Sequence, residues 1–89
     1  MNFQWNKTKA AINLTKHGVS FEEASTVFDE PLCEIVSGPD HSIEEFRWVI
    51  TGASDQGRLL VVSFTERGDK TRIISAREAT RREARDYAT

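Results

Sequence analysis

Eight side chains in this chain of 89 residues have types suited to binding a multi-oxygen anion and moving a proton beside it. An arginine guanidinium presents a planar fork of donors that matches phosphate oxygens, and a lysine ammonium adds a compact positive charge. Histidine has an ordinary pKa of ~6.5, so it can give or take a proton near neutrality. The eight residues are Lys9, Lys16, His17, Arg47, Arg67, Lys70, Arg72 and Arg77.

The reaction that this set fits is cleavage of a phosphodiester without a metal or other cofactor. In RNA the 2′-hydroxyl attacks the neighbouring phosphorus, which needs a base, a cation for the phosphorane oxygens and an acid for the leaving 5′ oxygen. We assign the proton transfer to His17 and the stabilisation of charge to Arg47 and Arg77. The remaining cations would hold the backbone: Lys9, Lys16, Arg67, Lys70 and Arg72.

Structural interpretations compete with these assignments. His17 follows Ala10 and Leu14 at helical spacing, so it could be a buried, hydrogen-bonded residue on the inward face of a helix. Lys9 and Lys16 could form an ordinary solvated helix face. A structural zinc site is not indicated, because two separated histidines and a single cysteine do not make one.

The element that would carry the arginines is a β-hairpin over residues 59–77. Its first strand is apolar at odd and even positions, which predicts cover on both faces. Gly68 supplies the positive φ that a tight turn needs. Because side chains alternate along a strand, Arg72 and Arg77 fall on opposite faces unless the strand ends or bends between them.

The other elements follow from capping and alternation signals. Asn6 and Gly18 bound a helix over residues 7–17, and the capping box from Ser20 to Glu23 starts a second helix over residues 21–28. Further strands are predicted at 3–5, 32–36 and 46–52, and a final helix at about 80–87. The fold class is therefore α+β, with a mainly antiparallel sheet of four to five strands.

Composition and charge describe one soluble domain over residues 1–89. The net charge of −2 conceals a segregated pattern: residues 1–20 hold three lysines and no acid, and residues 21–46 hold eight acids and no base. This pattern allows one basic and one acidic surface, or simply solvated charge. No apolar run approaches the ~20 residues of a membrane span. Cys33 is alone, so we expect a reducing cytoplasmic setting and no membrane partner.

Several strings together resemble the BrnT toxin family. They are Phe3-x-Trp5, the run from Lys9 to Ala24 that contains KHGVSFEEA, His41-x-x-x-Glu45-x-Arg47, and RIISAR at 72–77. The resemblance covers nearly the whole chain. Family pattern points to nine positions as candidates: Lys9, Asn13, Lys16, His17, His41, Glu45, Arg47, Arg72 and Arg77.

The resemblance implies a type II toxin with a RelE-like fold, in which two N-terminal helices and a C-terminal helix pack on the sheet. It implies an endoribonuclease that cleaves mRNA and inhibits translation. It also implies a BrnA-type antitoxin as partner, and binding of operator DNA by the toxin–antitoxin complex. A non-catalytic module that binds nucleic acid or a partner during autoregulation is the alternative.

Overall fold

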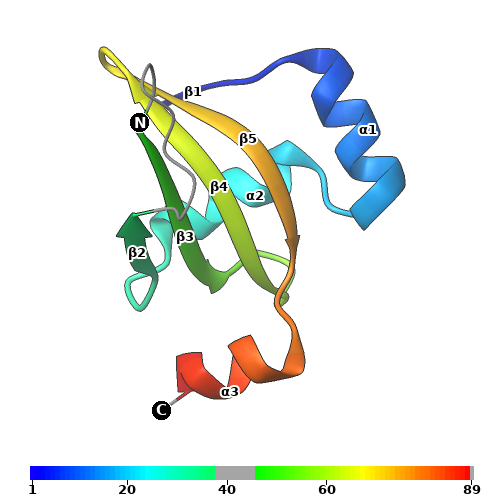
Figure 1. Cartoon of the computed structure of the whole chain (residues 1–89), viewed down its shortest axis with the longest axis vertical. Helices are drawn as coiled ribbons and strands as arrows, with labels where there is room; N and C mark the ends of the chain where they lie inside the picture. The colour runs from blue at the N-terminus through cyan, green and yellow to red at the C-terminus, as the bar shows by residue number, and fades with distance from the viewer. Residues whose placement is uncertain (38–45, 89) are drawn as a thin grey trace.

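The computed structural model describes residues 1–37 and 46–88, so His41 and Glu45 lie outside the described residues. The chain runs through a short strand, two helices, four strands and a last helix (Figure 1). The helices are α1 (Lys7–His17), α2 (Phe21–Thr26), a 3₁₀ turn η1 (Val27–Asp29) and α3 (Arg81–Ala88). The strands are β1 (Asn2–Gln4), β2 (Glu34–Ser37), β3 (Arg47–Ala53), β4 (Leu59–Arg67) and β5 (Lys70–Glu78).

All five strands form one mixed sheet in the order β1-β5-β4-β3-β2. The pairs β2–β3, β3–β4 and β4–β5 are antiparallel, and β1 pairs in parallel with β5. The predicted hairpin is confirmed, with Gly68 at φ 62° in its turn. β2 starts at Glu34 rather than at Leu32, because the Cys33 N–H donates to the Glu30 carbonyl and closes a turn first.

A β-bulge in β5 decides where its arginines lie. Ser63 pairs with Ser75 and Phe64 pairs with Ile73, so Ile74 is an extra residue without a partner across the ladder. A bulge shifts the alternation of side chains by one position. Both arginines of β5 therefore lie on the same face: Arg72 next to buried Ile73, and Arg77 next to buried Ala76.

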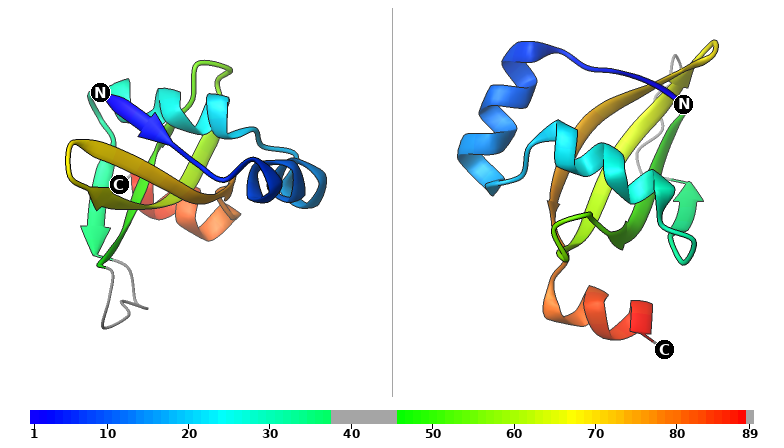
Figure 2. Two further views of the ribbon diagram at one scale, coloured as in Figure 1. Left: turned by 90° about the horizontal axis from the view of Figure 1, so that it is seen from above. Right: turned by 180° about the vertical axis from the view of Figure 1, so that it is seen from behind.

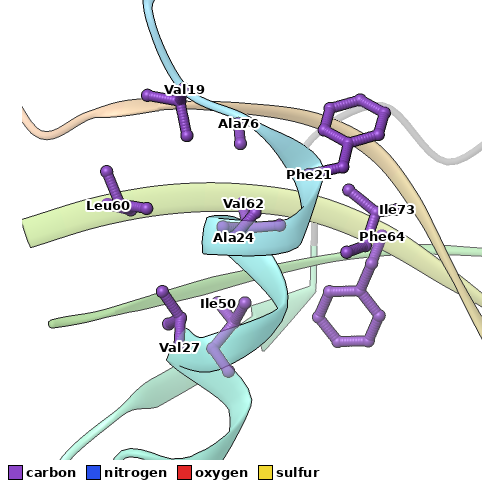
Figure 3. Packing of buried hydrophobic residues seen from close by; sticks show 10 residues of the cluster. All are labelled: Val19, Phe21, Ala24, Val27, Ile50, Leu60, Val62, Phe64, Ile73 and Ala76. Atoms are coloured by element: carbon purple, nitrogen blue, oxygen red, sulfur yellow. The ribbon is translucent and has the colours of Figure 1, made fainter. Parts of the chain in front are cut away.

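The apolar core lies between α2, η1 and one face of the sheet (Figures 2 and 3). Its buried members are Val19, Phe21, Ala24, Val27, Ile50, Leu60, Val62, Phe64, Ile73 and Ala76. Phe28 joins the layers edge-on, with its ring centroid 5.1 Å from that of Phe3 and 4.9 Å from that of Phe64. Trp5 and Trp48 are partly buried and pack against this cluster.

Helix α1 has the predicted caps but a different inward face. The Asn6 side chain accepts from the Lys9 N–H, and Gly18 ends the helix at φ 69°. The predicted inward face is correct for Ala10, which packs against the core, and wrong for Leu14, which is 52% exposed, and for His17, which is also exposed. The helix lies beside the edge of β5 (Figure 1) and turns Asn13 inward, where its amide bonds the backbone. His17 is thus a surface residue.

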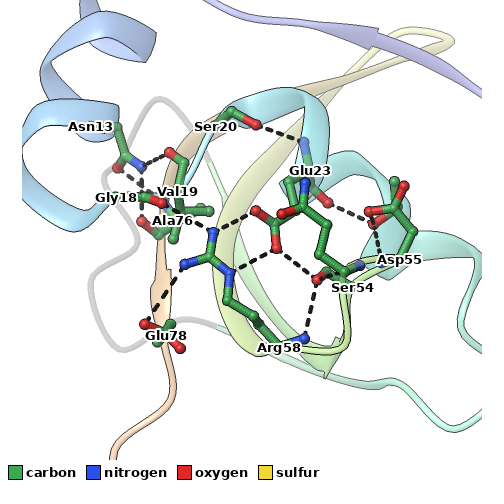
Figure 4. Close-up of polar contacts among 12 residues, drawn as sticks. Asn13, Gly18, Val19, Ser20, Glu23, Ser54, Asp55, Arg58, Ala76 and Glu78 are labelled. Carbon is green, nitrogen blue, oxygen red and sulfur yellow. Dashed lines mark hydrogen bonds and ion pairs between the residues drawn. The ribbon is translucent and has the colours of Figure 1, made fainter.

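A polar network fixes the start of α2 to the β3–β4 turn (Figure 4). The Ser20 hydroxyl accepts from the Glu23 N–H, as the capping box predicts. The buried Glu23 carboxylate turns toward Arg58, whose Nε donates to it at 3.0 Å and whose Nη2 forms a second bond. The Ser54 hydroxyl donates to the same carboxylate at 2.7 Å. Arg58 and Ser54 hold the pKa of Glu23 below its usual value.

Helix α3 lies across the sheet from α2, at one end of the opposite face (Figure 2). Its predicted capping box is present, because Thr80 Oγ1 accepts from the Glu83 N–H and Glu83 accepts from the Thr80 N–H. None of its residues is buried. Its side-chain attachments to the body include the Arg77–Glu83 pair and a 2.7 Å bond from the Tyr87 hydroxyl to the Leu32 carbonyl.

Candidate nucleic-acid interface

Five of the eight predicted site residues lie on one face of the sheet, the face away from α2. The strand register places them there, because each occupies the position in the alternation opposite to the buried core residues. We call this surface the arginine face, and it consists of Arg47, Arg67, Lys70, Arg72 and Arg77. The prediction that β4 is covered on both faces is correct in part: Val61 and Thr65 on this face are buried as well.

Arg47 and Arg72 flank Thr65 in one row across three strands. Thr65 pairs with Arg47 on β3 and with Arg72 on β5. Neighbouring strands are ~4.8 Å apart, so the two arginine Cα atoms are separated by roughly 10 Å. The Thr65 hydroxyl donates to the Phe46 carbonyl at 2.7 Å, which ties β4 to the beginning of β3. The row is therefore a rigid base for two guanidiniums.

Arg67 and Lys70 extend the arginine face to the tip of the hairpin. They pair with each other across β4 and β5, and both are exposed. Each lies two residues from a member of the row, Arg67 from Thr65 and Lys70 from Arg72, so all four point to the same side. Together with the row of Arg47 and Arg72, this end of the face holds four of its five positive charges.

The three α1 candidates meet at a shallow pocket beside the arginine face. Lys9, Lys16 and His17 line a space of about 200 Å³, together with Ile12, Asn13, Ile74 and Ser75. Ser75 belongs to the arginine face, because it pairs with Ser63 between the rows of Arg72 and Arg77. The pocket thus opens at the edge of the same face, and all eight candidates lie along one connected surface.

Arg77 forms a bidentate ion pair with Glu83 of α3. Its Nη1 and Nη2 donate to the two Glu83 oxygens at 2.7 and 2.9 Å, and Nη1 also donates to the Glu78 carbonyl. The guanidinium and the Thr80 backbone lower the pKa of Glu83 to about 2. The same pair raises the pKa of Arg77. In this arrangement Arg77 anchors α3, and its charge is largely compensated.

Sequence reasoning did not find the residues that connect these groups. Thr65 and Ser75 carry no charge and belong to no motif. Only the strand register shows that Thr65 lies between Arg47 and Arg72, and that Ser75 lies both in the pocket and on the arginine side of the sheet. From the alternation of side chains, the sequence predicts only that the strand must end or bend if Arg72 and Arg77 are to share a face. No local sequence signal marked the position of the bulge at Ile74.

Two negative findings apply to residues 1–37 and 46–88. Within them no group of three or more His, Cys, Asp or Glu side chains is arranged to hold a metal ion. No helix in this part of the chain is long and apolar enough to cross a membrane.

The fold and the site define a small α+β domain with a cationic sheet face suited to a polyanion. Comparison with known proteins then gives the family: residues 5–83 match the ribonuclease toxin BrnT of type II toxin–antitoxin systems. The chain belongs to this BrnT ribonuclease toxin family.

A solved structure supports the same fold. The crystal structure of the Brucella abortus ribonuclease toxin BrnT superimposes with a TM-score of 0.67 at 21% sequence identity, covering 91% of this chain and 99% of that one. No curated protein shows significant sequence similarity to this chain.

Proposed function

We propose that this BrnT-family chain is an endoribonuclease that cleaves mRNA without a metal ion and thereby inhibits translation. The observation that carries the proposal is the connected surface of Lys9, Lys16 and His17 with the arginine face. A phosphate backbone laid along the face would meet several cations in succession, which supplies most of the affinity of proteins for nucleic acid. We keep the RelE-like description of the fold as part of this proposal, supported by the N-terminal helix pair and the antiparallel strands.

In the proposed mechanism the RNA backbone lies beside the α1 pocket. His17 is exposed and lines the pocket, so it can accept the proton of the 2′-hydroxyl as that oxygen attacks phosphorus. The bond from phosphorus to the 5′ oxygen breaks, leaving a 2′,3′-cyclic phosphate, and the 5′ oxygen takes a proton from water to become a hydroxyl. Arg47 stabilises the added charge on the phosphorane oxygens, and Arg72 binds the RNA backbone beside it. Lys9, Lys16, Arg67 and Lys70 position the flanking nucleotides.

Arg77 enters the mechanism under one condition. Since both of its terminal nitrogens donate to Glu83, contact with a phosphate requires that the phosphate replace the carboxylate. The phosphorane carries two negative charges and the Glu83 carboxylate carries one, so the transition state competes for the guanidinium better than the ground-state phosphodiester does. We therefore assign Arg77 to transition-state stabilisation after exchange of partner, and Arg72 to binding throughout.

The partners follow from the family. Type II systems pair a toxin with an antitoxin, and we propose a BrnA-type protein in that role, with the complex binding operator DNA. The proposed compartment is the cytoplasm, where mRNA is available.

RNA cleavage with an excess of chelator tests the proposal. The purified wild-type chain should cut a single-stranded RNA in EDTA, leaving cyclic phosphate ends, and its expression without antitoxin should arrest growth. His17→Ala should lower the cleavage rate by at least about 100-fold, the usual contribution of a general acid or base. Arg82→Ala is the matched control, because Arg82 is an exposed cation on α3 outside the arginine face.

The alternative is a binding module without catalysis. The same cationic surface would then bind RNA or DNA and leave it intact. Retained RNA binding with no cleavage by the wild type, in EDTA and in added Mg²⁺ alike, would reject the enzyme and support this reading.

A further inference from the structure

β2 is the outermost strand of the sheet on the side away from β1 (Figure 1). All four of its residues are exposed. Among the described residues no strand pairs with its outer edge. Ile35 and Val36, 52% and 58% exposed, lie on opposite faces of the sheet, since they pair with Ile50 and Val49. The strand thus offers backbone donors and acceptors with an apolar side chain on each face.

Sheets with an unprotected edge bind further strands readily, and proteins usually block this with lysine, proline or a covering segment. β2 has none of these within Glu34–Ser37, and its one charge is Glu34. Exposed Leu32 extends the apolar surface just before the strand. An edge of this composition is suited to receiving an extended peptide, in which main-chain bonds give affinity and alternate side chains give specificity.

Acidic residues lead into this edge. Asp29 and Glu30 precede β2 and Glu34 is its first residue, and residues 29–37 contain no lysine or arginine. Glu30 is held at the turn into β2, because its carboxylate accepts from the Leu32 N–H at 3.2 Å. A second copy of this chain would bring its own Glu30 and Glu34 to the contact, which disfavours pairing of like edges. A partner with positive charges complements the edge instead.

We propose that the β2 edge is the docking site for an extended, basic segment of the antitoxin, which adds as a sixth strand with apolar side chains against Ile35 and Val36. The inference rests on the proposed toxin function, which requires an antitoxin. β2 adjoins β3, which carries Arg47. A segment anchored at this edge therefore directs the rest of the antitoxin across the arginine face.

Binding of the antitoxin encoded beside this gene tests the proposal by calorimetry. Ile35→Lys combined with Val36→Lys should weaken binding at least tenfold, because both apolar contacts are lost and two positive charges face a basic segment. Leu14→Lys is the matched control, since Leu14 is 52% exposed on α1 and lines neither edge nor pocket. Both proteins should keep the wild-type circular dichroism spectrum and melting temperature.

Hydrogen exchange gives an independent measurement that does not depend on a variant. Antitoxin binding should slow exchange of amides in residues 34–37 by at least tenfold in the wild-type chain. Unchanged exchange there, or equal affinity of the double variant and the wild type, would overturn the proposal. A wild-type dimer that forms without antitoxin and is lost in the double variant would also overturn it, in favour of a second copy as occupant.

RNA cleavage separates failure of this inference from failure of the proposed function. The double variant should cleave RNA at the wild-type rate and need at least tenfold more antitoxin for half inhibition. A wild type that binds antitoxin through β2 but does not cut RNA would reject the ribonuclease and keep the docking site. A double variant that cleaves RNA and is inhibited by the antitoxin as strongly as the wild type would reject the docking site and keep the ribonuclease.

Discussion

The side-chain amide of Asn13 bonds both backbone groups of Ala76, as a neighbouring strand would. Its oxygen accepts from the Ala76 N–H at 3.1 Å, and its nitrogen donates to the Ala76 carbonyl at 2.9 Å. The second amide hydrogen goes to the Val19 carbonyl at 2.9 Å. β1 pairs with β5 only as far as Arg72, so Asn13 continues the edge where that strand has ended (Figure 4).

Replacing Asn13 should therefore destabilise the fold. Asn13→Ala leaves three buried backbone groups without their partner and should lower the free energy of unfolding by about 2–3 kcal/mol. Asn13→Asp should cost more at neutral pH, since a carboxylate would face two carbonyl oxygens. Urea denaturation measures both, with Thr15→Ala, an exposed change on the same helix, as control. A loss below about 0.5 kcal/mol for Asn13→Ala would contradict this role.

The Glu23–Arg58 pair should contribute to stability because the Glu23 carboxylate is buried. Arg58→Met leaves this carboxylate, 3% exposed, with Ser54 as its remaining side-chain donor, and should lower the free energy of unfolding. Adding Glu23→Gln removes the unpaired charge and should recover part of the loss. Thermal or urea unfolding of the two single variants and the double variant forms the cycle. Strictly additive losses would show that the two side chains do not interact.

Acid should release α3 before it unfolds the core. The pKa of Glu83 is lowered to about 2 from a model-peptide value of 4.5, so its pair with Arg77 adds stability above pH 4.5 that is lost as the pH falls toward 2. Both side chains are more than a third exposed, so the contribution is at most about 1 kcal/mol. Tyr87 fluorescence followed by acid titration should change in this window, and Glu83→Gln should remove the dependence.

Salt dependence of RNA binding should count the phosphate contacts. Arg72→Ala should weaken binding and reduce the slope of log K against log salt by about 0.7 for single-stranded RNA. Arg77→Ala should change the slope less, because Glu83 already compensates its charge. Fluorescence anisotropy on the cleavage-deficient His17→Ala protein supplies the measurement. Equal slopes for wild type and Arg72→Ala would remove Arg72 from the interface.

Local signals in the sequence predicted the elements well. The hairpin turn at Gly68, the cap at Asn6 and the capping box from Thr80 to Glu83 are local interactions, and each has the expected partner. The box from Ser20 to Glu23 forms its Ser20 half, while the Glu23 carboxylate bonds Arg58 and Ser54 instead. The prediction that Leu14 lies on the inward face of α1 was wrong, because it relied on the spacing of apolar residues. The helix is held at a strand edge by Asn13, a contact that hydropathy cannot reveal.

The arrangement of the site needed long-range information. The alternation of side chains along a regular strand predicted Arg72 and Arg77 on opposite faces of the sheet. The bulge at Ile74 shifts this alternation and places both arginines on the same face. The pairing of Arg77 with Glu83 likewise depends on where α3 docks. Strand registers and the docking position of α3 are set by contacts between distant segments. The candidate cations could therefore be named from the sequence, but their arrangement on one surface could not be predicted from it.

The parallel pairing of β1 with β5 also sets an order of events during synthesis. Asn2–Gln4 emerges from the ribosome first, yet its partners on β5 lie at Lys70–Arg72. Arg47 and Arg72 likewise reach one row only through β4 between them. Pairings so distant along the chain form late. A nascent chain therefore lacks the assembled cationic surface until β5 has left the ribosome.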